Sequence, residues 1–415
     1  MLSVDQAESL ILKTAQSLTD QEITTLLNAQ QRILATDISS TLDFPYWDNS
    51  AMDGYAVRYA DVQACGPDTP AILDVVTEIP AGTCPNLSLA PGQAARIFTG
   101  AMVPQGADTV VMQENTLRQG DQVHILQCPQ PQAFVRKRGA YYQAGVPILK
   151  QGMTLTPPDI AILATVQCTE IPVYRRPVVA ILSTGNELVA PDQPLQAGQI
   201  VDSNRYALAA LVQATGAEVQ LIDLVGDTVE DLKAAIASTI PQADVVISSG
   251  GVSVGDYDYV DQVLAELNAD IHIRSVAVKP GKPLTFATFP TADGSQPVLY
   301  FGLPGNPVSA LVSFWRFVQP ALRKVSGQSG SWRPRFVEAR TLHPLPAGGR
   351  REIYLWGQLS LDDGQYEFTL AGGSHSSGNL MNLSQTNGLV VIPVDHPAVE
   401  AGESVSVMQV GEATT

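Results

Sequence analysis

Residues 244–256 read DVVISSGGVSVGD, an apolar, β-branched run that passes directly into a glycine-rich turn. Continuous apolar strands of this kind are typical of a parallel sheet covered by helices on both faces. The sequence around this stretch supports that reading, because strands and helices alternate on both sides of it. The other strands are expected at 178–182, 219–224, 271–278 and 298–301, and the helices at 203–213, 228–240, 257–267 and 307–318. The sequence therefore predicts a doubly wound α/β domain, in which ligands bind beyond the carboxyl ends of the strands.

The flanking regions have a different pattern. Short β-prone runs between residues 70 and 135 alternate with Gly/Pro turns, which predicts a small β domain. Residues 330–411 return to short alternating strands, and we expect a compact β barrel or sandwich there. Near the N-terminus, helical spacing predicts one helix over 3–18, capped by Ser3, and a second near 24–34.

Composition and charge narrow the classes of protein. With 415 residues, 45% of them hydrophobic, the chain has apolar material for several packed domains. Its 24 basic and 41 acidic residues give a formal charge of −17, which disfavours nucleic acid and acidic membranes as partners. The four cysteines form no CxxC pair, which argues against a disulfide scaffold or zinc ribbon. With no basic leader and no run of about 18 apolar residues, we expect a cytoplasmic protein.

The glycine-rich turn at 248–256 is a candidate anion site. It follows a strand and opens toward a helix, so it exposes backbone N–H groups beside the partial positive charge of a helix N-terminus. A tight turn without a ligand is the alternative, but the position at the carboxyl end of the sheet favours a phosphate.

Two further loops end strands of the same domain. KPGKP at 279–283 places Lys279 and Lys282 on a loop that its prolines stiffen. Exposed lysines commonly serve only solubility, yet their neighbourhood favours anion binding here. LPGNP at 303–307 precedes a helix, and it fits a ligand-contacting turn and a helix start capped by Asn306 equally well.

Three carboxylates follow strands of this domain. Glu187, Asp227 and Asp258 are expected at one rim, where each pair about 5 Å apart would repel by roughly 3 kcal/mol at an effective dielectric near 20. A shared cation relieves that repulsion, and oxygen ligands beside phosphates suit Mg²⁺. Each acid alone is more often a helix cap or a solvated side chain, so the hypothesis depends on their convergence.

Asp53 and Thr99 lie outside the α/β domain. Asp53 is part of NSAMDGYAV at 49–57, where a single aspartate is ordinarily a turn residue. Thr99 is part of RIFTGA at 96–101, a turn that offers a hydroxyl and free amides.

Seven motifs together resemble the molybdopterin molybdenumtransferase family, which includes bacterial MoeA and the E domain of gephyrin. They are NSAMDGYAVR (49–58), RIFTGAMVPQGADTVVMQE (96–114), STGNEL (183–188), GQIVDSN (198–204), SSGGVSVGDYDY (248–259), VKPGKPL (278–284) and GLPGNPVSAL (302–311). Their order and spacing extend the resemblance over most of the chain, more loosely in the C-terminal part.

The resemblance implies a multidomain fold of α/β plus β type. Its parts would be a discontinuous N-terminal helical and linker domain (1–50 and 140–175), an inserted β domain (51–139), a three-layer molybdopterin-binding α/β domain (176–327) and a C-terminal β barrel (328–415). It also implies a homodimer with a composite active site, in which the α/β domain of one subunit faces the N-terminal part of the other.

The implied reaction joins molybdate to adenylylated molybdopterin, breaks the phosphoanhydride and gives molybdenum cofactor and AMP, with Mg²⁺ as the metal. The adenylyltransferase and the proteins that accept the cofactor are further implied partners. Residues that match catalytic positions are Asp53, Thr99, Glu187, Asp227, Asp258, Lys279 and Lys282. Those that match substrate-binding positions are Ser249, Gly250, Gly251, Ser253, Pro304, Gly305, Asn306, Arg350 and Ser377. The metal would be held by Glu187, Asp227 and Asp258.

This sequence departs from the family pattern at several positions. GAYYQAG at 139–145 stands where a Gly-Glu-Asp is frequent, so a carboxylate expected near the cleft is missing around Tyr141. Asn186 replaces a common aspartate, and Asn382 replaces a common serine. After Arg350 and Arg351, a further family arginine is absent.

Two rival functions are weaker. A molybdopterin adenylyltransferase shares the α/β domain and its SSGG-type turn, but it typically consists of that domain alone. A scaffold of the gephyrin type would not require the carboxylates. Release of AMP that depends on molybdate distinguishes the insertion reaction from both.

Overall fold

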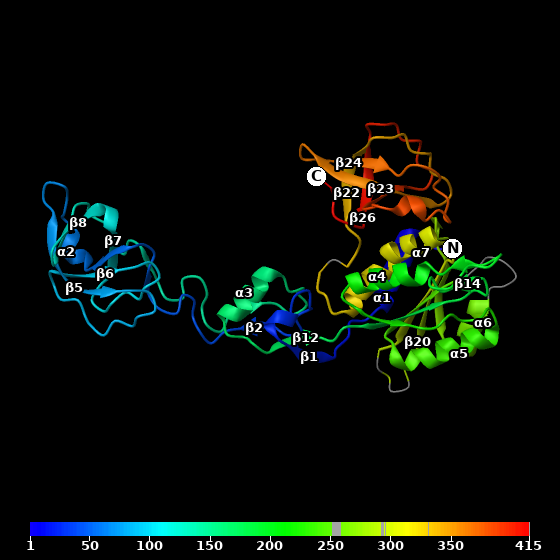
Figure 1. Cartoon of the computed structure of the whole chain (residues 1–415), viewed down its shortest axis with the longest axis horizontal. Coiled ribbons are helices and arrows are strands. Elements are labelled where there is room, and N and C mark those ends of the chain that lie inside the picture. The colour runs from blue at the N-terminus through cyan, green and yellow to red at the C-terminus, as the bar shows by residue number, and fades with distance from the viewer. Residues whose placement is uncertain (251–258, 292–293, 295, 331, 415) are drawn as a thin grey trace. The chain divides into compact units, whose positions relative to one another are not determined.

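The computed structural model describes residues 1–250, 259–291, 294, 296–330 and 332–414, and these divide into two compact units (Figure 1). Unit 1 comprises Met1–Thr36, Gln151–Ala161 and Cys168–Thr415, and unit 2 comprises Asp37–Lys150 and Ile162–Gln167. Residues Gly251, Ser253 and Asp258, for which site roles are predicted, lie outside the described residues.

The α/β domain of unit 1 contains a sheet of six strands among the described residues. Their order is β16 (Glu218–Leu221), β13 (Val178–Ser183), β17 (Val245–Ser249), β21 (Val298–Leu303), β20 (Pro283–Phe289) and β18 (Asp270–Ser275). The first four run parallel, whereas β20 is antiparallel to both of its neighbours. The prediction of a largely parallel sheet holds for its central part, and β20 is a strand that the sequence pattern did not indicate.

Helices cover both faces of this sheet. Alternate residues of β13 enter different cores, because successive side chains of a strand point to opposite faces. Val179 and Ile181 pack with α1 (Val4–Thr14), α4 (Asn204–Ala214), α7 (Pro307–Ser313) and α8 (Gln319–Val325). Ala180 and Leu182 pack with α5 (Val229–Thr239) and α6 (Tyr259–Glu266). The predicted three-layer, doubly wound arrangement is confirmed.

Sequence signals explain the helix ends. Ser3 caps α1, as predicted, through a capping box with Gln6. Thr228 caps α5 by accepting a hydrogen bond from the Asp231 N–H. The helix expected over 307–318 continues beyond that range, through a π-helical turn at Phe314–Val318 into α8.

The C-terminal part of unit 1 is a closed barrel, which decides between the two architectures that the sequence left open. Its strands pair in a ring, because β23 bonds to both β24 and β25, and β22 and β26 complete the circuit. The strands are β22 (Phe336–Thr341), β23 (Glu352–Asp362), β24 (Gln365–Leu370), β25 (Gly388–Ile392) and β26 (Ser404–Gln409).

A short strand of the α/β region also joins the barrel sheet. β19 (Val278–Lys279) pairs in parallel with the start of β23. The single strand expected at 271–278 is therefore wrong, because this stretch is divided between β18 in the α/β sheet and β19 on the barrel.

The helix predicted near 24–34 is also wrong. β1 (Gln21–Thr24) pairs with β12 (Ile171–Tyr174), and only a 3₁₀ turn, Leu26–Asn28, follows it. Leu27 is 95% exposed, so the apolar spacing there does not mark a buried face. The backbone of the next residues bonds instead to the segment at 153–155, since tertiary pairing overrides local propensity.

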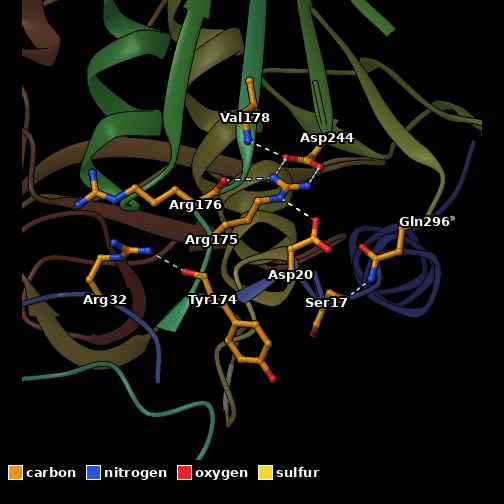
Figure 2. A network of polar contacts seen from close by, with 9 residues as sticks. All are labelled: Ser17, Asp20, Arg32, Tyr174, Arg175, Arg176, Val178, Asp244 and Gln296. Atoms are coloured by element: carbon orange, nitrogen blue, oxygen red, sulfur yellow. Dashed lines mark hydrogen bonds and ion pairs between the residues drawn. The ribbon is translucent and has the colours of Figure 1, made fainter. Parts of the chain in front are cut away.

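One arginine ties these N-terminal pieces to the α/β sheet (Figure 2). Arg175 follows β12 and donates two hydrogen bonds of 2.7 Å to the Asp244 carboxylate, just before β17, and one of 2.9 Å to Asp20. Asp244 also accepts the Val178 N–H at 2.7 Å. These contacts raise the pKa of Arg175, the bonds to Asp244 most of all.

Unit 2 has its own six-stranded sheet within the described residues. The strand order is β7 (Thr109–Met112), β4 (Gly54–Val57), β6 (Gln93–Ile97), β5 (Ala71–Ile79), β9 (Gln122–Ile125) and β8 (Thr116–Gln119). The small β domain expected between 70 and 135 is thus observed. Shorter elements of unit 2 are α2 (Tyr59–Val62), β2 (Ile38–Ser39), β3 (Asn49–Ser50), β10 (Val135–Arg136) and β11 (Pro147–Leu149). The residues of α3 (Pro157–Thr165) are divided between the two units, and β14 (Leu188–Val189) and β15 (Ile200–Val201) belong to unit 1.

Among the described residues, no helix has the length and apolarity needed to cross a membrane.

Candidate functional site

A cavity of about 1190 Å³ lies in unit 1 at the carboxyl ends of β13, β17 and β21. We call it the strand-end cavity. The segments that line it are 183–188, 200–204, 226–228, 249–250 and 304–307, together with single residues such as Gly378 and Met381 of the barrel domain. The placement agrees with the expectation that ligands bind beyond the carboxyl ends of the strands.

The start of the glycine-rich turn forms one wall of this cavity. Gly250 has a φ of +94°, and a Cβ atom there would lie 2.5 Å from the Thr184 carbonyl oxygen. Glycine is needed for both reasons. The Gly250 N–H donates to the Leu303 carbonyl at 3.3 Å, which joins this turn to the 303–307 loop. Ser249 and Gly250, for which phosphate binding is predicted, both line the cavity.

The 303–307 loop contributes Pro304, Gly305 and Asn306 to the cavity lining. Asn306 occupies the N-cap position of α7, but its side chain donates to the Ser377 hydroxyl at 3.0 Å instead of capping the helix. The Val308 N–H also donates to the Ser377 carbonyl. The barrel domain is therefore fastened to this loop through Ser377.

Two of the three predicted metal carboxylates line the cavity. Glu187 and Asp227 are exposed at its rim. Asn186 and Asp227 bond reciprocally, because the Asn186 N–H donates to Asp227 Oδ2 at 2.8 Å and the Asp227 N–H donates to Asn186 Oδ1 at 3.3 Å. Within the described ranges, no group of three His, Cys, Asp or Glu side chains comes close enough to hold a metal ion.

The predicted basic residues form a neighbouring patch beside the cavity. Lys279 lies in β19 and Lys282 on the loop that follows it, and the described residues provide neither ammonium with a hydrogen bond. Arg351, next to the exposed Arg350, donates to the Val278 carbonyl at 3.4 Å. The β19–β23 pairing thus brings the KPGKP loop next to both arginines.

Asp53 and Thr99 come together in unit 2. The Thr99 N–H and hydroxyl both donate to Asp53 Oδ1, each at 2.7 Å. The backbone bond is the main cause, and the hydroxyl bond the next, of a pKa of Asp53 below its usual value. Tyr141, at the departure from the family pattern, is 64% exposed and packs against Phe44 with ring centroids 5.9 Å apart.

Sequence reasoning missed four residues of the cavity wall. Ser183, Thr184, Asp202 and Asn204 are buried and line it. Asn204 donates 2.8 Å hydrogen bonds to both the Ser249 hydroxyl and the Gly305 carbonyl, so it holds the two loops in register. The signal was present, since Asp202 and Asn204 belong to the motif GQIVDSN, but their side chains were given no role.

Known families cover nearly the whole chain. Residues 2–166 match the MoeA N-terminal region (domain I and II), residues 180–324 a probable molybdopterin binding domain, and residues 338–410 the MoeA C-terminal region (domain IV).

Individual relatives agree with these matches. A molybdopterin molybdenumtransferase of a Nostoc species is 58% identical over 94% of this chain and 89% of its own length. The one of Haemophilus influenzae is 37% identical over 98% of both chains. Among solved structures, a MoeA protein of Pyrococcus horikoshii, described as a molybdopterin biosynthesis protein, superposes with a TM-score of 0.83 at 30% identity, covering 99% of each chain.

Proposed function

This chain belongs to the MoeA family of molybdopterin molybdenumtransferases, transferases of molybdenum cofactor biosynthesis, and on that premise we propose that it inserts molybdate into adenylylated molybdopterin and releases AMP. In this reaction the P–O bond to AMP breaks with the addition of water, and two Mo–S bonds form at the dithiolene. Two molybdate oxygens leave as water with the two dithiol protons and two protons from solvent, and molybdenum stays Mo(VI), so no oxidant is needed.

The observation that carries this proposal is the strand-end cavity, where a glycine turn for anions lies beside two carboxylates. Ser249 and Gly250 would bind the phosphate part of the substrate, because both line the cavity at the start of the glycine-rich turn that follows β17. Asn204 keeps this turn and Gly305 at a fixed separation. Because these two loops are already held in place, less conformational entropy is lost when the substrate binds.

The rim of the cavity fits Mg²⁺. Glu187 and Asp227 supply hard oxygen ligands, and Mg²⁺ is commonly held by one or two carboxylates together with substrate phosphates. Asp258 is the third proposed ligand. Bound there, the metal would withdraw charge from the phosphoanhydride. Asn186 orients Asp227, since it occupies Oδ2 and leaves Oδ1 free of protein contacts among the described residues.

Lys279 and Lys282 would receive molybdate. Their ammonium groups neutralise an oxyanion, and a preorganised cationic site lowers the cost of bringing a dianion to the dithiolene. Arg350 and Ser377 are proposed to support this anion, because Arg350 adjoins β23 beside the lysine loop and Ser377 adjoins the 303–307 loop.

We also propose a cytoplasmic homodimer, in which Asp53 and Thr99 of one protomer complete the cavity of the other. Asp53 and Thr99 belong to unit 2, whereas the cavity belongs to unit 1. Adenylylated molybdopterin would come from the adenylyltransferase, and cofactor acceptors would take the product. The −17 charge disfavours nucleic acid or acidic membranes as partners.

Turnover with the purified protein tests the proposal. Adenylylated molybdopterin and Mg²⁺ are supplied with or without molybdate, and AMP is quantified by chromatography. We expect AMP only when molybdate is present. AMP release that ignores molybdate, or consumption of ATP with unmodified molybdopterin, would overturn the assignment in favour of hydrolysis or adenylyl transfer.

A further inference from the structure

The wall of the strand-end cavity holds polar atoms that the protein itself leaves without partners. Among the described residues these are Ser183 Oγ, Thr184 Oγ1, Asp202 Oδ2 and Asn204 Oδ1. All four side chains belong to buried residues, and Asp202 is only 3% exposed. A buried polar atom without a hydrogen bond is destabilising, so a cluster of them at a cavity indicates that a ligand supplies the missing bonds.

The hydrogen bonds around Asp202 and Asn204 fix what that ligand must offer. Both amide hydrogens of Asn204 are used, toward Ser249 and Gly305, so its Oδ1 can only accept. Asp202 Oδ1 accepts the Arg205 N–H at 3.2 Å, which leaves Oδ2 as a second acceptor. The ligand must therefore present hydrogen-bond donors.

This requirement excludes phosphate from this part of the wall. Phosphate oxygens are acceptors and carry negative charge, so they would be repelled by the Asp202 carboxylate. We assign the phosphate to the Ser249–Gly250 side, at the start of the glycine-rich turn. The cavity thus has one wall for an anion and an adjacent wall for donors.

We propose that Asp202 and Asn204 bind the aminopyrimidinone edge of the pterin. This inference rests on the proposed function. The 2-amino group and N3–H of a pterin are neighbouring donors, and they match two buried acceptors. Adenine is a poorer match, because its one amino group is flanked by ring nitrogens that accept. The neighbouring hydroxyls of Ser183 and Thr184 can either donate or accept, so they can satisfy the carbonyl beside this edge.

Two small ligands that differ only at the 2-position test the proposal. The probe is 6-hydroxymethylpterin, and the comparison ligand is the corresponding lumazine, in which oxygen replaces the 2-amino group. Binding to the full chain is followed by ligand fluorescence. We expect the wild-type protein to bind the pterin at least about tenfold more tightly than the lumazine. In the lumazine, the 2-oxo group is a hydrogen-bond acceptor and would face an acceptor oxygen of the protein.

Asp202→Asn is the informative variant. The Arg205 N–H still selects the side-chain oxygen, so the new amide group faces the ligand as a donor. We expect the pterin affinity to fall about tenfold or more and the preference for pterin over lumazine to disappear or reverse. The ratio of the two affinities does not depend on the fraction of protein that is folded. Asp192→Asn, at an exposed position outside the cavity lining, is the matched control and should behave as wild type.

Titration with AMP and with Mg²⁺ alone separates the competing explanations. We expect the AMP affinity of Asp202→Asn to stay within about twofold of wild type. A loss of AMP affinity, a Mg²⁺-dependent shift in Tm that needs Asp202, or an unchanged pterin preference would each overturn the proposal. So would failure of the wild-type protein to bind the pterin. Failure of molybdate-dependent AMP release with a normal pterin preference would refute the proposed reaction and leave the pterin subsite standing.

Discussion

Thr99 gives two hydrogen bonds to a single oxygen of Asp53, one from its N–H and one from its hydroxyl, each 2.7 Å long. Both bonds favour the charged form of the carboxyl group, which is why its pKa is lowered. Asp53 therefore stays ionised to a lower pH than an ordinary aspartate does. This ionised group stabilises the fold at higher pH, and that contribution is lost as the pH falls through the lowered pKa.

Thr99→Val tests this relationship. The variant keeps the N–H bond and loses the hydroxyl bond, so the pKa of Asp53 should rise part of the way toward about 3.9. Carbon-detected NMR titration of the Asp53 carboxyl group measures it. An unchanged pKa would mean that the backbone bond alone sets the value. Thr99→Ser, which keeps the hydroxyl, should titrate as wild type.

Gly250→Ala should damage the glycine turn more than its backbone angle alone predicts. The added Cβ would meet the Thr184 carbonyl oxygen at 2.5 Å. Gly402 is a matched control, because it has the same φ of +94° and open space around its Cβ position. We expect Gly402→Ala to cost about 1–2 kcal/mol of unfolding free energy. Gly250→Ala should cost more and should also weaken AMP binding, as calorimetry would show. Equal costs would contradict the steric argument.

Mixed dimers test whether the site is shared between protomers. Asp53→Asn and Asp227→Asn should each inactivate the homodimer. If Asp53 serves the partner's cavity, mixing equal amounts and allowing exchange should restore roughly a quarter of wild-type activity, because half of the dimers then contain one intact site. AMP release after mixing measures this. No recovery, with exchange verified by mass spectrometry, would place both residues in the same protomer's site.

Glu352 should give the fold a pH dependence opposite to that of Asp53. Burial is the main cause of a raised pKa of Glu352, although the Tyr354 hydroxyl donates to it at 2.5 Å. The protonated Glu352 makes its full contribution to stability below about pH 4.3, and this contribution is lost as the pH rises through the raised pKa. Glu352→Gln keeps an acceptor for Tyr354 and removes the charge. Urea unfolding between pH 4 and 8 should show a weaker loss of stability with rising pH in the variant. Parallel curves would contradict this.

Arg175→Lys should lower the free energy of unfolding by about 1–3 kcal/mol, because a lysine cannot reproduce the forked contact with Asp244 while also reaching Asp20. The exposed pair of Lys233 and Glu266 is the control. Glu266→Gln there should cost less than about 1 kcal/mol. Chemical denaturation of both variants provides the comparison, and equal costs would contradict a special role for the arginine fork.

The parts of the fold that the sequence predicted well are those whose signals are local. β17 begins with the apolar run Val245–Ile247, and α5 begins one residue after its capping Thr228. The failures come from long-range pairing. β1 depends on β12, about 150 residues later, and β19 leaves the α/β sheet to join the barrel. Periodicity within a short window carries no information on either partner.

The site shows the same division. Gly250 and Glu187 were predicted from loops that follow apolar strands, and both line the cavity. Asp202 and Asn204 were missed because an aspartate and an asparagine at the start of a helix are ordinarily capping residues. Only the three-dimensional contacts show that Asn204 donates both amide hydrogens to two separate loops and that its buried oxygen has no partner among the described residues.

The parallel pairing of β19 with β23 also limits how this protein can be divided. A fragment that ends after α8 would retain β19 but lose the barrel strand that satisfies its backbone, and it would lose the Ser377 contacts with the 303–307 loop. An unpaired strand edge next to a lysine-bearing loop invites self-association. Attempts to express the α/β region as a minimal enzyme should therefore retain the barrel, and chimeras between relatives should exchange the two as one block.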